Sequence, residues 1–172
     1  MVLEQRIDKE DLERWHRILD AKGWVCPLWP VEYGGTGWNA AKQFIFKEEL
    51  QMAPAPDPLG QNINLVGPVI CAFGTEEQKK RFLPKIRSLE YWFAQGFSEP
   101  NAGSDLANLA TRAHLEDDEW VIDGQKVWTS LAHFSHWCFV LCRTDRDAPR
   151  HRGISYLLVP MDQPGIEVRP IK

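Results

Sequence analysis

The period of the hydrophobic pattern changes once along the chain, between residues 85 and 91, and this change limits the possible folds more than any other feature. Before it, apolar residues recur at the three- and four-residue spacing of amphipathic helices. After it, short runs rich in Val, Ile, Leu, Trp, Phe and Thr alternate with turn residues, as in β-strands. We therefore predict an α+β protein, with a helical N-terminal domain at residues 1–90 and an antiparallel, β-barrel-like domain at residues 91–172.

Several residues in the first half are placed to begin or end helices. Asp8 and Asn39 each precede a periodic apolar segment, and Thr75 together with Gln78 matches the Thr-x-x-Gln capping box. Gly23 can end the first of these helices. The predicted helices cover residues 8–22, 39–52 and a short segment that begins at residue 75.

Composition argues against several classes of function. The 172 residues include 20 Lys and Arg against 24 Asp and Glu, without a basic cluster, so we expect no nucleic-acid partner. The longest apolar run, Leu65–Gly74, contains Pro68 and is far shorter than the about 20 residues of a membrane-spanning helix, so we expect no membrane span. The four cysteines form no Cys-x-x-Cys unit, which predicts reduced thiols and a cytoplasmic location. His133 and His136 lack a nearby third ligand, so we expect no metal site.

An Asp-Gly dipeptide gives the sharpest local prediction in the β region. Asp123-Gly124 stands between Trp-Val-Ile and Gln-Lys-Val-Trp, which predicts a two-residue type I′ hairpin that pairs Ile122 with Gln125. The predicted strands are residues 91–97, 108–116, 119–122, 125–130, 136–144, 153–160 and 166–171.

The expected hairpin also assigns side chains to two faces. Trp120, Ile122 and Val127 would face the core, whereas the opposite, mixed face would carry Glu119, Val121, Lys126, Trp128 and Ser130. A Trp ring beside a hydroxyl suits a flat heteroaromatic cofactor. A Trp that covers a sheet edge or a neighbouring helix would show the same pattern, so both interpretations stay open.

A polar loop that contains glycine, Gln95–Asp105, follows an aromatic strand. Its small residues let backbone N–H groups approach an anionic or carbonyl-bearing ligand, and Ser98 and Ser104 add hydroxyls. The loop has neither the Lys of a Walker loop nor the Gly-x-Ser-x-Gly of a serine hydrolase. The alternative is an ordinary β–β loop capped by Asp105.

The most specific pattern combines this loop with a later segment. Ser98-Glu-Pro-Asn-Ala-Gly-Ser-Asp105 is followed by Gly124-Gln-Lys-Val-Trp-Thr-Ser130. In residue identity, order and spacing, these motifs resemble the acyl-CoA dehydrogenase family, most of all the bacterial subgroup of pimeloyl-CoA dehydrogenase large subunits and steroid side-chain enzymes. Further matching segments are Trp29–Gly35, Phe73–Lys79, Thr111–Ala113, Arg143–Asp145 and Gly153–Ser155.

The resemblance implies that the chain carries part of an FAD site. Ser98 and the backbone at Phe97 would contact the pyrimidine edge of the flavin, Trp128 would stack beside the isoalloxazine, and Ser130 would lie near N5. Ser104 would lie near the pyrophosphates of FAD and of the CoA substrate. The implied cofactor-binding set is Gln95, Phe97, Ser98, Gly103, Ser104, Trp128, Thr129 and Ser130.

The implied reaction is α,β-dehydrogenation of an acyl-CoA thioester, with hydride transfer to flavin N5 and onward transfer to an electron-transfer flavoprotein. A helix around Asn64–Pro68 would line part of the acyl pocket. The family's catalytic Glu lies in a C-terminal domain beyond the motifs matched here. We therefore expect no catalytic residue in this chain, a middle domain that is incomplete at its C-terminus, and an inactive isolated polypeptide.

The resemblance leaves the assembly and two functional alternatives open. It implies a homo- or heterotetramer for the full-length protein. One alternative is a flavin monooxygenase built on the same fold. The other is a non-catalytic partner subunit of a heterotetramer.

Overall fold

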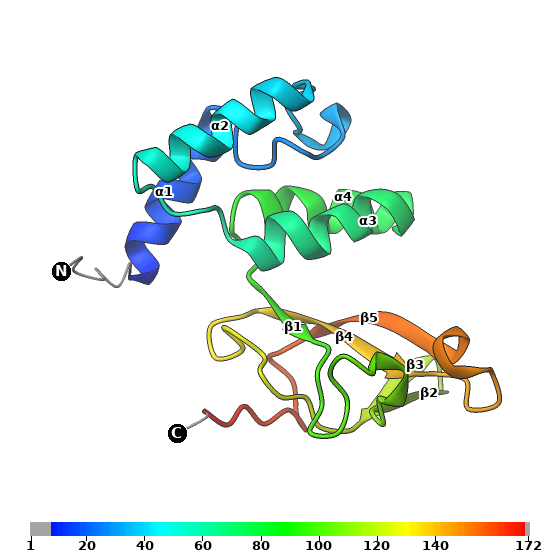
Figure 1. Cartoon of the computed structure of the whole chain (residues 1–172). Coiled ribbons are helices and arrows are strands. Elements are labelled where there is room, and N and C mark those ends of the chain that lie inside the picture. The colour runs from blue at the N-terminus through cyan, green and yellow to red at the C-terminus, as the bar shows by residue number, and fades with distance from the viewer. Residues whose placement is uncertain (1–7, 171–172) are drawn as a thin grey trace. The chain divides into compact units, whose positions relative to one another are not determined.

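The computed structural model describes residues 8–170, and its internal contacts divide the chain into two units, residues 1–91 and residues 92–172 (Figure 1). The first unit is helical and the second is built around a sheet, which confirms the predicted order of an α+β chain. No helix between residues 8 and 170 is long and apolar enough to cross a membrane.

The helical unit contains four α-helices and two short helical segments. The three predicted caps are confirmed: the side chains of Asp8 and Asn39 accept the backbone N–H groups of the third residue after each, and Thr75 forms the reciprocal capping box. The elements are α1 (Lys9–Ala21), η1 (Val31–Tyr33), α2 (Ala40–Met52), the π-helix η2 (Gln61–Val66), α3 (Gly67–Phe73) and α4 (Glu76–Arg87).

Buried polar contacts join the helices of this unit. The indole of Trp29 is buried and donates from Nε1 to the Ile63 carbonyl at 2.8 Å. Asn62, also buried, donates from Nδ2 to the carbonyls of Ile86 and Tyr91 at 3.1 and 2.6 Å. These bonds tie η2 to the loop before α2 and to the end of α4. The stretch around Asn64–Pro68, where we expect part of the acyl pocket, spans the junction of η2 and α3.

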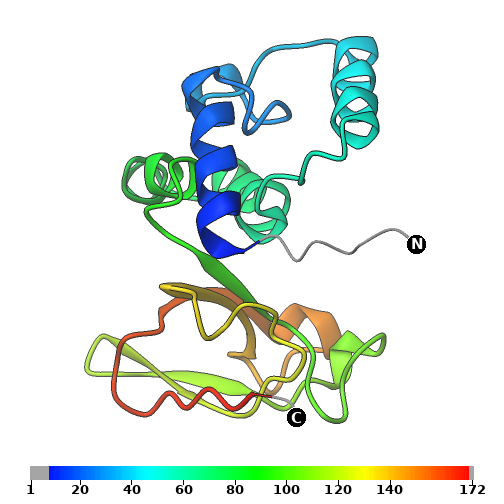
Figure 2. The ribbon, with the colours of Figure 1, turned by 90° about the vertical axis from the view of Figure 1, so that its left-hand side faces the viewer.

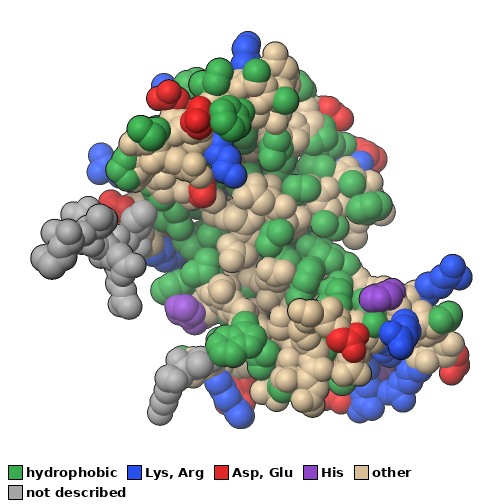
Figure 3. Space-filling model, viewed as in Figure 1, with side chains coloured by type: hydrophobic (Ala, Val, Ile, Leu, Met, Phe, Trp, Pro, Cys, Tyr) green, Lys and Arg blue, Asp and Glu red, His purple; other side chains and the backbone are tan. Residues whose placement is uncertain are grey.

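Helix α2 contributes little to the core of its own unit. Leu50 is its only buried residue, while Phe44, Ile45 and Met52 are exposed. Exposed apolar side chains are frequent over the helical part of the surface that faces the viewer in Figure 3.

The sheet of the second unit is mixed, which corrects the prediction of antiparallel pairing throughout. Strand β4 runs parallel to β1 and antiparallel to β5, and β2 is antiparallel to β3 but parallel to β4, which it meets only at Arg112 and Arg143. The parallel strands β1 and β4 are joined by the long connection that such pairing requires, residues 97–136, which includes β2 and β3 and ends in a stretch, residues 124–136, that lies in no strand. The strands are β1 (Phe93–Gly96), β2 (Arg112–Glu116), β3 (Glu119–Asp123), β4 (Trp137–Arg143) and β5 (Ile154–Pro160).

The predicted hairpin at Asp123-Gly124 does not form, and the hairpin that does form lies six residues earlier, between the predicted strands 108–116 and 119–122. Asp117 and Asp118, with φ of 46° and 65°, form the turn between β2 and β3, and Ala113 pairs with Ile122 (Figure 2). Two consecutive positive φ angles are what a type I′ turn needs, and Asp tolerates them better than most residues. Gly124 meets a different requirement: a Cβ there would lie 2.4 Å from Thr111 Oγ1, so only glycine lets the chain pass this close.

The wrong turn also misplaces part of the predicted core face. Residues 125–130 and 166–170 form no strand, the pairing of Ile122 with Gln125 does not exist, and Trp120 is exposed rather than in the core. Ile122, in contrast, packs against the apolar cluster of the sheet, as predicted. Cys138 and Cys142 also lie buried in this cluster, as predicted from their four-residue spacing on a strand.

Candidate functional site

A tight turn follows β1 and begins the motif loop. The backbone groups of Glu99 and Ala102 hydrogen-bond to each other in both directions, at 2.7 and 3.1 Å. Because this turn reverses the chain, the Glu99 side chain lies among later residues of the same unit rather than in solvent.

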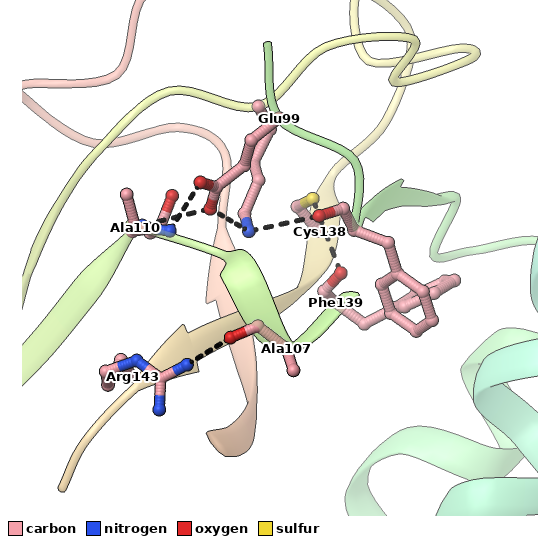
Figure 4. Close-up of polar contacts among 9 residues, drawn as sticks. Glu99, Ala107, Ala110, Cys138, Phe139 and Arg143 are labelled. Carbon is pink, nitrogen blue, oxygen red and sulfur yellow. Dashed lines mark hydrogen bonds and ion pairs between the residues drawn. The ribbon is translucent and has the colours of Figure 1, made fainter. Parts of the chain in front are cut away.

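The Glu99 carboxylate is buried and fully engaged (Figure 4). It accepts the backbone N–H groups of Ala110 and Thr111 at 2.6 and 3.0 Å, and the Lys126 ammonium at 2.7 Å. Burial by itself would raise the pKa of this carboxyl, but the hydrogen bonds from Lys126 and from the two backbone groups outweigh it and lower the pKa from 4.5 to about 2. Glu99 is therefore an ionised structural acceptor at neutral pH.

Lys126 reaches this carboxylate across the face of the sheet. Its ammonium also donates to the Phe97 carbonyl at 3.2 Å, and its side chain is only 12% exposed. The aliphatic stem passes Gly96, where a Cβ would lie 3.5 Å from Lys126 Cγ and 3.1 Å from Cys138 Sγ. The glycine of the Gln-Gly-Phe-Ser sequence thus relieves a tight approach to Cys138 and Val140, while Lys126 lies at an ordinary contact distance.

The backbone completes the junction between the two motif segments. Val127 N–H donates to the Ser98 carbonyl at 2.9 Å. Phe97, Ser98 and Glu99 are therefore held directly against Lys126 and Val127, and Trp128 is the next residue. The structure thus brings together the two segments that carry the candidate flavin contacts.

Three of the expected site residues follow this junction. The Trp128 side chain is 73% exposed, and its backbone has a positive φ of 58°, uncommon for a bulky residue. Thr129 Oγ1 is buried and has no hydrogen-bond partner among the described residues. Ser130 is exposed, and its N–H donates to the Trp128 carbonyl at 3.0 Å.

The remaining expected residues lie on or after β1. Gln95 is half-buried opposite Phe139, and the ring of Phe97 packs edge-on against that of Phe139. Gly103 and Ser104 are exposed beyond the turn, and a Cβ at Gly103 would meet no atom within 4 Å. The hydrogen bonds that join the two motif segments are made by residues 97–99 and 126–127.

Sequence reasoning missed the pairing of Glu99 with Lys126. Both residues are part of the recognised motifs, but Lys126 was expected on the mixed face of a hairpin. A charged residue inside each motif was the available signal, although nothing in the spacing indicates that the two charges meet. Within residues 8–170, no group of three or more His, Cys, Asp or Glu side chains is placed to hold a metal ion.

Comparison with known proteins identifies the family of the chain. The acyl-CoA dehydrogenase N-terminal domain matches residues 3–90, and the acyl-CoA dehydrogenase middle domain matches residues 94–172. Acyl-CoA dehydrogenase IpdE1 of Mycobacterium tuberculosis is 53% identical over 163 residues, which cover 94% of this chain and 42% of that protein. Acyl-CoA dehydrogenase FadE26 of the same organism is 45% identical over 152 residues, 87% of this chain and 38% of that protein.

Solved structures show the same relationship. The Tcur3481-Tcur3483 steroid ACAD superimposes with a TM-score of 0.85 at 44% identity, over 96% of this chain and 43% of that one. The ChsE4-ChsE5 complex from Mycobacterium tuberculosis has a TM-score of 0.78 at 44% identity, over 89% and 38% of the two chains. The chain thus spans less than half the length of the relatives it matches. It belongs to the acyl-CoA dehydrogenase family of oxidoreductases, and it corresponds to the N-terminal and middle domains of that family.

Proposed function

We propose that this chain is the N-terminal and middle-domain part of an FAD-dependent acyl-CoA dehydrogenase that introduces an α,β double bond into an acyl-CoA thioester. The observation that carries the proposal is the junction at Ser98 and Val127, which joins the two motif segments in a member of this family. FAD, when bound, supplies the acceptor for the hydride that leaves the substrate's β-carbon.

The residues present fit a flat, hydrogen-bonding cofactor. Trp128 is 73% exposed and so offers a large apolar surface for stacking, and the neighbouring Thr129 Oγ1 has no hydrogen-bond partner within residues 8–170. A large apolar side chain held in solvent next to an unpaired buried hydroxyl is typical of a site whose ligand completes its contacts.

The proposal assigns roles to both motif segments. Trp128 stacks on the flavin, while Ser98, the Phe97 backbone and Ser130 hydrogen-bond to its polar edge, and Gln95 and Thr129 line the same site. Gly103 and Ser104 lie beside the pyrophosphates of cofactor and substrate, where a residue without a Cβ and a hydroxyl suit close approach of an anion. The proposal assigns no catalytic base to this chain, and the isolated polypeptide is expected to be inactive.

The names of two similar structures suggest a substrate class and an assembly. One similar structure is called a steroid ACAD, and another is described as a complex of two components. We accordingly propose acyl-CoA as the substrate, with a steroid-derived acyl group as the first to test. We also propose a tetramer with either an identical chain or a second dehydrogenase chain, electron-transfer flavoprotein as the acceptor, and the cytoplasm as the compartment.

Titration of the 172-residue chain with FAD tests the cofactor assignment. The visible flavin spectrum is expected to shift on binding, and Trp128→Ala is expected to weaken binding by about tenfold or more, because stacking on a desolvated ring is lost. Trp120→Ala is the matched control, since Trp120 is also an exposed Trp of the sheet unit but lies on β3. No spectral shift with the unmodified chain, or equal affinities for Trp128→Ala and the unmodified chain, would refute the assignment.

A further inference from the structure

The Glu99 and Lys126 side chains connect three segments that are distant in sequence. The carboxylate holds the backbone at Ala110 and Thr111, just before β2, and the ammonium holds the carbonyl of Phe97. Figure 4 shows these bonds meeting at one point, with the Glu99 carboxylate directed toward Ala110. Both side chains are nearly excluded from solvent, at 6% and 12% exposure.

The segment after Lys126 has few other restraints on its position. Residues 128–131 lie in no strand, and the backbone hydrogen bonds of this turn run between near neighbours: Ser130 N–H donates to the Trp128 carbonyl, and Ala132 N–H donates to the Thr129 carbonyl. Trp128 and Leu131 both have positive φ, a conformation that persists only where surrounding structure imposes it. The location of the Trp128 ring relative to Ser98 therefore depends on how residues 126 and 127 are anchored.

We propose that the Glu99–Lys126 pair is a positioning element of the flavin site, which fixes Ser98 and Trp128 at the separation that the cofactor requires. This inference rests on the proposed function. Neither charged group is assigned a contact with substrate or cofactor; the pair acts through Ser98, Val127 and Trp128.

The hydrogen bonds of the pair require the carboxylate at position 99 and the ammonium at position 126. Glu99 accepts two backbone N–H groups in addition to the ammonium, and a lysine at position 99 has no acceptor to offer them. Exchanging the two residues would preserve opposite charges and still leave Ala110 and Thr111 unpaired. A simple ion pair would tolerate this exchange, whereas the positioning element would not.

The test compares three variants of the 172-residue chain without any ligand. The double variant Glu99→Gln/Lys126→Met removes both charges and so leaves no unpaired buried ion. Lys126→Arg keeps the charge. Arg112→Met is the matched control, since it breaks the exposed Arg112–Asp123 pair of the same unit. Amide exchange of Val127 and the indole N–H resonance of Trp128 are measured by NMR.

In the double variant, we expect Val127 to exchange at least about tenfold faster while β4 amides such as that of Phe139 keep their rates, because the opening is local. The Trp128 resonance should shift at the same time. The single variant Lys126→Arg should keep most of the Val127 protection seen in the unmodified chain, and Arg112→Met should change neither the Val127 exchange rate nor the Trp128 resonance. If the double variant does not fold, Glu99→Gln/Lys126→Gln, which likewise leaves no unpaired buried ion, is measured in the same way, with the same expected direction.

Binding of FAD supplies the second readout. Affinity should fall by about tenfold or more in the double variant and remain within about threefold of the unmodified chain in Lys126→Arg, as found when a group that orients a ligand-binding residue is lost. Unchanged Val127 exchange and an unchanged Trp128 resonance in the charge-free variant would overturn the inference. If the unmodified chain fails to bind FAD, the proposed function fails, and the ligand-free measurements still decide whether the pair positions Trp128.

Discussion

Replacement of Gly67 by Ala is expected to destabilise the helical unit, although the same change usually stabilises a helix. Gly67 is buried at the start of α3, and a Cβ there would lie 1.9 Å from Trp29 Cζ2 and 2.6 Å from Cε2. Contact normally requires more than 3.4 Å, so the indole would have to move by more than an ångström. Trp29 resists this movement because it is 4% exposed and its Nε1 donates to the Ile63 carbonyl at 2.8 Å.

The magnitude follows from two opposing effects. Forcing extra volume into a packed core costs about 1–3 kcal/mol, and loss of the Trp29 hydrogen bond would add about 1 kcal/mol. Relief of the helix penalty of glycine returns at most about 1 kcal/mol. We therefore expect Gly67→Ala to lower the free energy of unfolding by about 1–3 kcal/mol.

Urea unfolding followed by circular dichroism at 222 nm measures this change. Gly60→Ala is the matched control: it has helical dihedrals, and its Cβ would meet only Asn64 Nδ2 at 3.9 Å. This control should be neutral or stabilising by up to about 1 kcal/mol. In a Trp29→Leu background, which removes the obstructing ring, adding Gly67→Ala should cost little. A Gly67→Ala protein as stable as the unmodified chain, or a full cost retained in the Trp29→Leu background, would show that the clash is not the cause.

Two further predictions concern ionisation. Because the Glu99 pKa falls from 4.5 to about 2 on folding, the contribution of this carboxylate to stability is complete above about pH 4.5 and is lost as the pH drops toward 2, by up to about 3 kcal/mol. Urea titrations of Glu99→Gln at several pH values should lack this part of the pH dependence, whatever the absolute stability of the variant. A pH dependence equal to that of the unmodified chain would contradict the assignment. Burial raises the pKa of Cys26 and Cys138 to about 12, and Cys71 is the only one of the four thiols that is not buried. Ellman's reagent at pH 8 should therefore show one faster-reacting thiol, and Cys71→Ser should remove this fast phase. A fast phase that survives the substitution would count against the burial pattern.

Local features of the fold could be predicted because local chemistry produces them. Asp8, Asn39 and Thr75 cap helices through bonds to residues three positions later, so the sequence contains both partners. The change from helical to β periodicity likewise reflects which face of each element is buried. The motif segments were recognisable for a different reason, since they match a family.

The hairpin shows how a local signal can mislead. Asp117-Asp118 and Asp123-Gly124 both tolerate unusual backbone angles, and the dipeptide with the stronger turn preference is not the one that turns. The choice was made by packing: Ala113 and Ile122 pair across the hairpin beside the core cluster, and Gly124 passes over Thr111 where no side chain fits.

By itself, the sequence determined the change from a helical to a β unit, the helix caps, the family and the two segments that carry the candidate flavin contacts. Only the tertiary structure decided that Glu99 and Lys126 meet, and that Trp128 is presented by a turn rather than by a strand. The physical reason is the separation along the chain between the residues that interact. A cap or a periodic face depends on neighbours within a few residues, whereas a buried ion pair between positions 99 and 126 depends on the path of all the chain between them.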